Sequence, residues 1–310
     1  MNIVVTGSLG NVSQPLAEKL VRKGHNVTVI SSNPRRQNAI ENLGATAAIG
    51  KMEDADFLAS SFTGADVVYC MIPLNLSVGE PHAYLRNIAQ NYVKAIKRSG
   101  IKRMILLSGW VAGVLDTYKE LENMFNDLRD VSVTHIRPGY FYSNFYDSIG
   151  MIKGQGLMGA LMALRYMGLG VLLTGKRGML LGNFGGDDPL ILSAPSDIAD
   201  AIVDEMTHPR QGKNVRYVAS DKMTCNEAAT ILGTAIGKPY LKWVRLTDKA
   251  MQQGLQQFGL SPKVAATIVE MQAPVHKGLM AMEFAKHDPF VGKVKMGDFV
   301  KEFAAIYNNH

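Results

Sequence analysis

Gly7 and Gly10 belong to a short turn of the kind that lets a backbone approach a phosphate group. They follow residues 2–5, a β-branched apolar run typical of a buried strand. An amphipathic segment over residues 14–23 comes next, and Gly24 ends it as a helix cap does. Strand, glycine turn and helix in this order are the setting that a dinucleotide-binding fingerprint requires.

Each glycine has its own expected role in this turn. Gly7 permits the tight turn, and Gly10 lets the backbone reach a pyrophosphate on the helix N-terminus. Ser13 stands where the fingerprint usually has a third glycine. We expect the turn to contact the cofactor through Thr6, Gly7, Ser8, Leu9, Gly10, Asn11 and Val12. An ordinary turn between a strand and a helix is the alternative interpretation.

The end of the second predicted strand, residues 26–30, indicates which dinucleotide binds. The residues that follow are Ser31, Ser32, Asn33, Arg35 and Arg36, with Pro34 between them. An NAD site usually places Asp or Glu there to bind both ribose hydroxyls. Hydroxyl and guanidinium groups instead suit a 2′-phosphate, which arginine binds with two parallel hydrogen bonds. We therefore predict NADP (as NADPH) over NAD, the alternative being two solvated arginines at a helix start.

The composition is that of an ordinary soluble globular protein, with 310 residues of which 47% are hydrophobic and 19% charged. Its net charge of +6 comes from scattered lysines and arginines, so direct nucleic-acid binding is not expected. Cys70 and Cys225 are the only cysteines and the seven histidines are isolated, which predicts neither a disulfide framework nor a metal site. With no recognisable signal peptide, the sequence predicts a cytoplasmic protein.

Strands alternate with helices through the first half of the chain. Beyond the segments named above, we predict strands over 45–49, 65–72, 103–107 and 131–136, and helices over 37–43, 80–99 and 118–128. This alternation predicts an α/β fold with a doubly wound parallel (Rossmann) sheet, in which ligands bind at the carboxyl ends of the strands. Met71, Ile72 and Ser108 stand at such ends, so we expect them at the cofactor.

The alternation breaks after Gly139, which predicts a second, interleaved α+β lobe. Three later segments are predicted to return to the first domain: strands over 190–193 and 215–219, and a helix over 196–206. A Thr-Cys-Asn-Glu capping box then begins a helix over 224–237. We assign the dinucleotide-binding domain to 1–139 with returning pieces at 189–219, and a smaller substrate-binding lobe to 140–188 and 220–310.

Residues 157–174 are almost wholly apolar and approach the length of a membrane span. Gly159, Gly168, Gly170 and Arg165 interrupt them, and Gly156 precedes them, so we predict no membrane span. We expect instead a mobile wall or lid of an apolar substrate pocket, in which the methionines of the segment adapt to ligand shape. A contact with a membrane surface, or with a second copy of the chain in a homodimer, is the alternative.

Five short motifs run through most of the chain: Val5-Thr-Gly-Ser-Leu-Gly10, Ser32-Asn-Pro-Arg35, Leu106-Leu-Ser108, Ile136-Arg-Pro-Gly-Tyr-Phe141 with Asn144, and Ser196-Asp-Ile-Ala-Asp200. In this order they resemble the NmrA-like, atypical branch of the short-chain dehydrogenase/reductase superfamily. The resemblance implies a Rossmann domain that holds NAD(P) and a small variable lobe that holds the substrate. It does not imply one activity, because members include quinone and other NADPH-dependent reductases as well as redox sensors that bind the dinucleotide.

The sequence departs from the superfamily's usual catalytic unit, a Ser followed by Tyr-x-x-x-Lys. In that unit the lysine lies one helical turn from the tyrosine and lowers the phenol pKa. Ser108 is suitably placed, but Tyr118 is followed four residues later by Glu122, which would raise the phenol pKa instead. Relatives also often have Gly-Asp after the third strand, where this chain has Gly50-Lys51, so the adenine contact is open.

Other residues could supply the missing chemistry. The resemblance implies a cofactor-contacting lysine or histidine near Tyr118, and Lys119 could fill that role although it points about 100° away around the helix. Tyr140 is a further candidate proton donor, together with Tyr142 and Tyr146. Their alternative role is aromatic packing between the lobes.

These residues together favour an NADPH-dependent reductase that passes hydride to a small apolar acceptor, either quinone-like or enal/enone-like. Such an acceptor can take hydride from a well-placed nicotinamide with little help from a strong acid. The alternative is a non-catalytic NAD(P)-binding redox sensor or regulator. The missing Tyr/Lys pair argues against nucleotide-sugar epimerisation.

Overall fold

The computed structural model describes residues 1–154, 164, 165, 169 and 178–309. Contacts divide the chain into two units. Unit 1 comprises Met1–Pro138, Pro195–Val218 and Asp288–Phe290, and unit 2 comprises Gly139–Ala194, Ala219–His287 and Val291–His310. The segment 157–174, for which we predicted an apolar lid, lies outside the described residues except at 164, 165 and 169.

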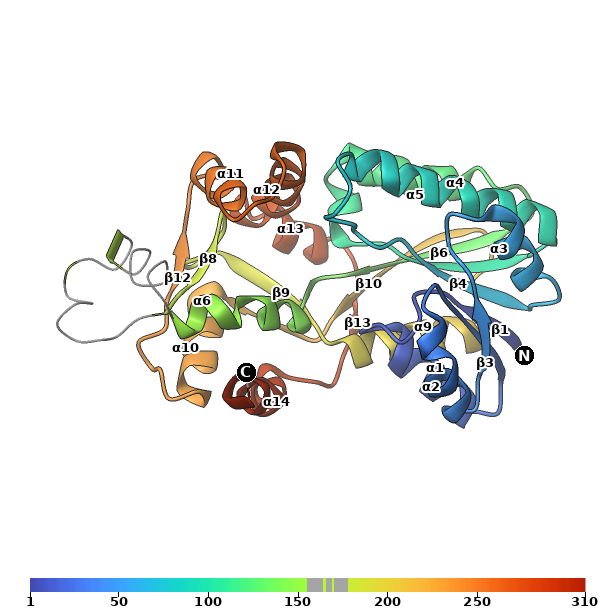
Figure 1. Cartoon of the computed structure of the whole chain (residues 1–310), viewed down its shortest axis with the longest axis horizontal. Coiled ribbons are helices and arrows are strands. Elements are labelled where there is room, and N and C mark those ends of the chain that lie inside the picture. The colour runs from blue at the N-terminus through green and yellow to red at the C-terminus, as the bar shows by residue number, and fades with distance from the viewer. Residues whose placement is uncertain (155–163, 166–168, 170–177, 310) are drawn as a thin grey trace. The chain divides into compact units, whose positions relative to one another are not determined.

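Unit 1 is built on a mainly parallel sheet of eight strands (Figure 1). In sheet order they are β13 (Phe290–Val291), β10 (Lys213–Ala219), β6 (Ser132–Pro138), β5 (Arg103–Leu107), β4 (Val67–Met71), β1 (Asn2–Val5), β2 (Asn26–Ser31) and β3 (Thr46–Ile49). Because β1 pairs in parallel with both β2 and β4, the order of strands reverses at β1. This is the switch point of a Rossmann-like α/β fold, and the predicted fold class is confirmed.

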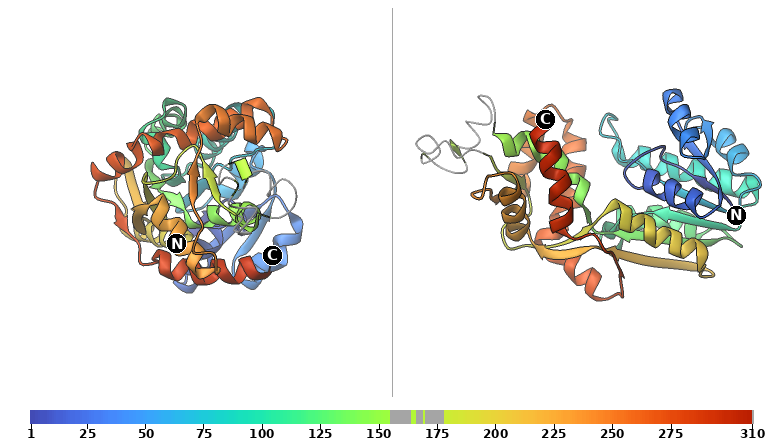
Figure 2. Two further views of the ribbon diagram at one scale, coloured as in Figure 1. Left: turned by 90° about the vertical axis from the view of Figure 1, so that its left-hand side faces the viewer. Right: turned by 90° about the horizontal axis from the view of Figure 1, so that it is seen from below.

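Helices cover both faces of this sheet. One face carries α3 (Ala55–Phe62), α4 (Pro81–Ser99) and α5 (Asp116–Asn126) (Figure 1). The other carries α1 (Ser13–Arg22), α2 (Gln37–Asn42) and α9 (Pro195–Thr207), and the right-hand view of Figure 2 is taken from that side. An ion pair of 2.5 Å between Lys19 Nζ and Asp200 Oδ1 joins α1 to α9, so the later segment 195–218 is held in the same unit.

The apolar pattern of each helix explains where it packs. On α4 the side chains of Leu85, Ile88, Tyr92 and Ile96 are buried against the sheet. Pro81 occupies the first turn and Gly100 ends the helix in the left-handed region at φ 73°. Helix α3 was not predicted, because its buried face consists only of Leu58 and Phe62.

Unit 2 contains two small sheets and several helices. One sheet has the order β11 (Asp221–Thr224), β9 (Pro189–Ser193), β7 (Tyr140–Phe141), and the other pairs β12 (Trp243–Arg245) with β8 (Leu180–Gly182). The principal helices are α6 (Ile149–Lys153), α10 (Cys225–Ala235), α11 (Asp248–Gln257), α12 (Pro262–His276), α13 (Leu279–Ala285) and α14 (Met296–Asn309). The capping box of α10 is present, with Thr224 and Glu227 bonded reciprocally.

One expected strand belongs to a different sheet from the one predicted. We expected 190–193 to return to the dinucleotide-binding domain, but β9 pairs antiparallel with β11 and parallel with β7 inside unit 2. The Ser193 hydroxyl accepts the backbone N–H of Gly139 at 2.9 Å, which ties β9 to the segment leaving β6. Both faces of β9 are buried, so its apolar pattern is the same as that of a central Rossmann strand. Among the helices of the described residues, none combines the length and apolar character needed to cross a membrane.

Candidate cofactor site

The turn between β1 and α1 needs glycine at Gly7 for its backbone conformation and favours it at Gly10 for lack of space. Gly7 lies in the left-handed region at φ +92°, and a Cβ there would come within 2.7 Å of Ser13 Oγ and 2.8 Å of Met71 Cγ. A Cβ on Gly10 would lie 3.0 Å from the Gly7 carbonyl oxygen. The two glycines therefore allow the chain to double back tightly before the helix begins.

Ser13, which replaces the usual third glycine, has its own partner in the turn. Its hydroxyl donates to the Thr6 carbonyl at 2.8 Å, and the side chain is buried. The Thr6 hydroxyl in turn accepts the backbone N–H of Met71 at 2.9 Å. The turn is thus fastened to the carboxyl end of β4, where Met71 and Ile72 are half-buried.

The N-terminus of α1 is open to an anion. No side chain caps it, and its first turn contains no acidic residue. The backbone N–H groups of Leu9, Val12 and Ser13 have no backbone acceptor among the described residues. Unpaired N–H groups at the positive end of a helix form an anion site, so this part of the chain fits a pyrophosphate.

The segment after β2 combines a buried anchor with exposed polar groups. The Ser31 hydroxyl is buried, lies 2.9 Å from the Ser8 hydroxyl and accepts the N–H of Asn33 at 3.2 Å. Ser31 therefore joins this segment to the glycine turn, and Ser32 presents the exposed hydroxyl. Arg35 and Arg36 are exposed on a 3₁₀ turn capped by Asn33, and no carboxylate pairs with either guanidinium within the described ranges.

Gly50, which follows β3, is explained by packing. A Cβ there would lie 2.5 Å from the ring of Phe57 on α3. The exposed Lys51 stands next to it where the resemblance leads one to expect an acid.

Ser108, at the carboxyl end of β5, belongs to a buried polar network. Its hydroxyl donates to Glu122 Oε1 at 2.6 Å. Arg137 donates to the same carboxylate through Nε at 2.9 Å and Nη2 at 2.6 Å, and through Nη1 to the Tyr217 hydroxyl at 2.8 Å. Burial acts to lower the pKa of Arg137, but the hydrogen bonds and charge of Glu122 outweigh it and raise this pKa above its usual value. Sequence reasoning missed Arg137 and Tyr217, whose positions are opposite each other on β6 and β10.

Tyr118 and Lys119 lie in the first turn of α5, which faces the same edge of the sheet. Lys119 is exposed. The ring of Tyr118 meets the ring of His82 edge-on, with centroids 6.0 Å apart. His82 is the second residue of α4, so two helix N-termini bring this pair together. The sequence offered no signal for the pairing because the two residues are on different helices.

Tyr140, the remaining catalytic candidate, lies in unit 2 in a cluster of aromatic rings. It packs edge-on against Phe145, Phe184 and Trp243, with centroids 5.7 to 6.4 Å apart. Burial, followed by the charge of Asp147, raises the pKa of its phenol. Tyr142 stacks on Phe299 at 4.9 Å, so this strand end contributes aromatic packing to unit 2.

The thiols and metal-binding side chains show no reactive grouping. Cys70 and Cys225 are both buried and unbridged, and burial raises the pKa of the Cys225 thiol to about 12. The part of the chain that the structure describes contains no cluster of three or more histidine, cysteine or acidic side chains suited to a metal ion.

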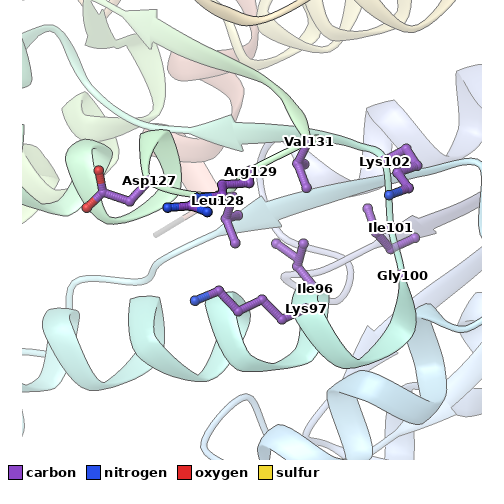
Figure 3. A pocket seen from close by; sticks show the side chains of 9 residues that line it. All are labelled: Ile96, Lys97, Gly100, Ile101, Lys102, Asp127, Leu128, Arg129 and Val131. Carbon is purple, nitrogen blue, oxygen red and sulfur yellow. The ribbon is translucent and has the colours of Figure 1, made fainter.

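A surface pocket lies where strands β5 and β6 of the unit 1 sheet begin, at the end of the strands opposite the glycine turn (Figure 3). It has a volume of about 280 Å³ and is lined by Ile96, Lys97, Gly100, Ile101, Lys102, Asp127, Leu128, Arg129 and Val131. These residues belong to the ends of α4 and α5 and to the turns that precede β5 and β6. The pocket is therefore separate from the glycine turn and from Ser108, which lie at the carboxyl ends of the strands.

Comparison with known proteins agrees with the geometry of unit 1. Residues 7–144 match the family described as NAD(P)H-binding, so the chain contains an NAD(P)H-binding domain. The matched range includes the glycine turn, the segment after β2 and the Ser108 network up to Arg137. A comparison with curated protein sequences found no match.

Several solved structures share the fold along nearly the whole chain. The NADPH-dependent quinone oxidoreductase of Escherichia coli, solved with NADPH, is 19% identical with a TM-score of 0.74 and covers 97% of this chain and 99% of its own. The triphenylmethane reductase of a Citrobacter species, solved with NADP(H), is 16% identical with a TM-score of 0.72 and the same coverage. A nucleoside-diphosphate-sugar epimerase of Staphylococcus aureus is 14% identical with a TM-score of 0.71, covering 97% of this chain and 100% of that protein.

Proposed function

We propose that this protein is an NADPH-dependent reductase that transfers hydride to a small apolar, conjugated acceptor such as a quinone or an enal. One observation carries the proposal. The segment after β2 ends in the exposed Ser32, Arg35 and Arg36 and has no acid there, beside a helix N-terminus that no side chain caps. This combination suits a dinucleotide that carries an extra phosphate on its adenosine ribose.

The cofactor cradle, which consists of the glycine turn with the N-terminus of α1 and the segment after β2, would hold a different part of NADPH with each of its parts. The N–H groups of Leu9, Val12 and Ser13 would bind the pyrophosphate. Ser32, Arg35 and Arg36 would bind the 2′-phosphate by charge-assisted hydrogen bonds. When bound, NADPH supplies a hydride, which is a proton with two electrons. The residues of this chain have to bind it, orient it and manage the accompanying proton.

The proton chemistry of the chain favours an acceptor that needs little acid. Ser108 directs its hydroxyl hydrogen to Glu122, and Tyr118 has no lysine one helical turn away. A quinone accepts hydride to give a phenolate that water can protonate, so a strong protein acid is not required. The names of the E. coli quinone oxidoreductase and the Citrobacter triphenylmethane reductase add support, because the first names a quinone and the second a compound with several aromatic rings.

A dinucleotide sensor without turnover is the second candidate. The hydrogen bond from Ser108 to Glu122 favours this candidate as well. A site that never reduces an acceptor does not need a side chain that can donate a proton. Unit 2 remains our candidate for the substrate-binding part of a reductase, or for the signalling part of a sensor.

One experiment separates the two functions. NADPH oxidation is followed with a panel of benzoquinones, naphthoquinones and enals, beside a binding titration of NADPH to the same protein. Turnover with at least one acceptor supports the reductase. Tight NADPH binding without oxidation by any acceptor supports the sensor, and absence of NADPH binding contradicts both.

A further inference from the structure

Ser108 is fixed as a hydrogen-bond acceptor. Its Oγ lies 2.6 Å from Glu122 Oε1, and a carboxylate can only accept, so the hydroxyl hydrogen points at Glu122. The backbone N–H of Ser108 donates to the Ile136 carbonyl at 2.9 Å. Any other group that approaches the Ser108 side chain must therefore donate a hydrogen bond to it.

Glu122 cannot turn away to release this hydrogen. Arg137 binds both of its oxygens, and the side chains of Glu122 and Arg137 are 3% and 10% exposed. Arg137 also donates through Nη1 to the Tyr217 hydroxyl at 2.8 Å and through Nη2 to the Ala112 carbonyl at 3.4 Å. The contacts come from α5, β6, β10 and the turn after β5, so the network is braced by several elements.

Ser108 also lies at the edge of the sheet where the cofactor cradle is. Leu107 pairs with Met71 on β4, and the Met71 N–H binds Thr6 in the glycine turn. Two strand spacings, about 10 Å, separate the end of β1 from the end of β5. A dinucleotide whose pyrophosphate rests on α1 has its nicotinamide half available to cross β4 toward Ser108.

We propose that Ser108 Oγ accepts a hydrogen bond from the carboxamide NH₂ of the nicotinamide ring, and that Glu122 and Arg137 are positioning residues that keep Ser108 in its accepting state. The inference rests on the proposed binding of NADPH. It assigns Ser108 to orientation of the cofactor and not to protonation of the acceptor. The carboxamide is the one hydrogen-bond donor on the nicotinamide ring itself.

The test compares NADPH with its 3-acetylpyridine analogue, which has a methyl group in place of the carboxamide NH₂ and keeps every ribose hydroxyl. Dissociation constants of both reduced dinucleotides are measured by titration calorimetry. We expect Ser108→Ala to weaken NADPH about fivefold, the effect of one neutral hydrogen bond, and to leave the analogue unchanged. Ser99→Ala is the matched control, because the Ser99 hydroxyl bonds only within its own helix and should change neither constant.

The positioning role is read from the ratio of the two dissociation constants. In Glu122→Gln the side chain can donate to Ser108, so the preference for NADPH over the analogue should fall toward that of Ser108→Ala. If the variant is only less stable, the smaller folded fraction weakens the apparent binding of both dinucleotides by the same factor. The ratio of the two dissociation constants then stays unchanged.

Each result decides the inference. Equal weakening of both dinucleotides by Ser108→Ala would place the contact elsewhere on the cofactor and overturn it, as would no weakening. If the wild type binds neither dinucleotide, the proposed function fails as well. If the protein binds NADPH but Ser108→Ala does not change its preference for NADPH over the analogue, only the proposed role of Ser108 fails.

Discussion

Arg137 holds Glu122 side-on, with Nε 2.9 Å from Oε1 and Nη2 2.6 Å from Oε2. Glu122 stands four residues after Tyr118, where the superfamily has its catalytic lysine. We expected its charge to act on the Tyr118 phenol. The structure shows that Arg137 balances this charge and that Ser108 shares the carboxylate, so the position serves a buried network.

Removing the charge of Glu122 should destabilise the protein strongly. Glu122→Gln leaves the Arg137 guanidinium buried without a counter-charge, and the free energy of unfolding should fall by about 3–5 kcal/mol. Urea denaturation at neutral pH measures this change.

Glu120→Gln on the same helix is the control. Glu120 pairs with Arg86 at 3.3 Å, but both side chains are largely exposed. Its loss should change the free energy of unfolding by less than about 1 kcal/mol. Equal effects of the two substitutions would show that burial of the Glu122 pair is energetically unimportant.

His135 should make stability depend on pH in the acid range. Its ring is buried on β6 and its Nε2 lies 2.8 Å from Asn126 Oδ1. Burial lowers the pKa of His135 to about 4 in the folded protein. The unfolded chain therefore binds a proton more readily, so the stability is complete above about pH 6.5 and falls as the pH drops toward 4, by up to about 3 kcal/mol.

The measurement is the free energy of unfolding of wild type and His135→Gln between pH 7 and pH 4.5. Glutamine keeps an amide donor for Asn126 and does not titrate. The wild type should lose more stability than the variant as the pH falls. Parallel curves for the two proteins would contradict the assignment.

Tyr118 should matter more for some acceptors than for others. Hydride addition to an enal leaves an enolate that requires a proton, whereas a quinone gives a phenolate that water can protonate. Tyr118→Phe should therefore lower kcat for an enal by about tenfold or more and change kcat for a quinone much less. Tyr84→Phe, which removes a phenol on α4 that donates to Glu53 at 3.1 Å, should leave both rates unchanged.

The local signals in the sequence were sufficient for the Rossmann strands and the glycine turn. Residues 2–5 and 103–107 form β1 and β5 as predicted, because an apolar run followed by glycine or serine specifies a buried strand and its end. The fixed φ of Gly7 and the uncapped N-terminus of α1 follow from the same short stretch.

The contacts between distant segments could not be predicted in the same way. Arg137 and Tyr217 are 80 positions apart and meet only because β6 and β10 are neighbours in the sheet. The apolar pattern of residues 190–193 predicted a strand but not the sheet to which it belongs. A buried strand shows the same apolar pattern in either unit. His82 and Tyr118 likewise meet through the packing of two helices.

Trp110 should report cofactor binding. It lies two residues beyond Ser108, begins the 3₁₀ turn Trp110–Gly113, and is 6% exposed. We expect NADPH to quench its emission, and Trp110→Phe to remove most of the change in a fluorescence titration. Trp243 lies in the aromatic cluster of unit 2, so Trp243→Phe should leave most of the change. The reverse outcome would mean that the end of β5 does not face the nicotinamide.

Arg35 and Arg36 should determine the preference for NADPH. Their guanidinium groups are exposed, lie next to Ser32, and have no carboxylate partner within the described residues. Replacing both with alanine should weaken NADPH binding by about 1–3 kcal/mol, the effect of losing charged hydrogen bonds, and leave NADH nearly unchanged. Titration of both dinucleotides against wild type and variant measures the difference.

A matched variant separates this effect from the general charge of the protein. Arg98 and Arg129 are also exposed, but Arg98 lies in the last turn of α4 and Arg129 in the turn between α5 and β6, where the strands of the sheet begin. Replacing both with alanine removes the same charge, and we expect the ratio of NADPH to NADH affinity to stay as in the wild type. A wild type that prefers NADH, or an equal loss for both dinucleotides in the Arg35/Arg36 variant, would show that the segment after β2 does not bind the 2′-phosphate.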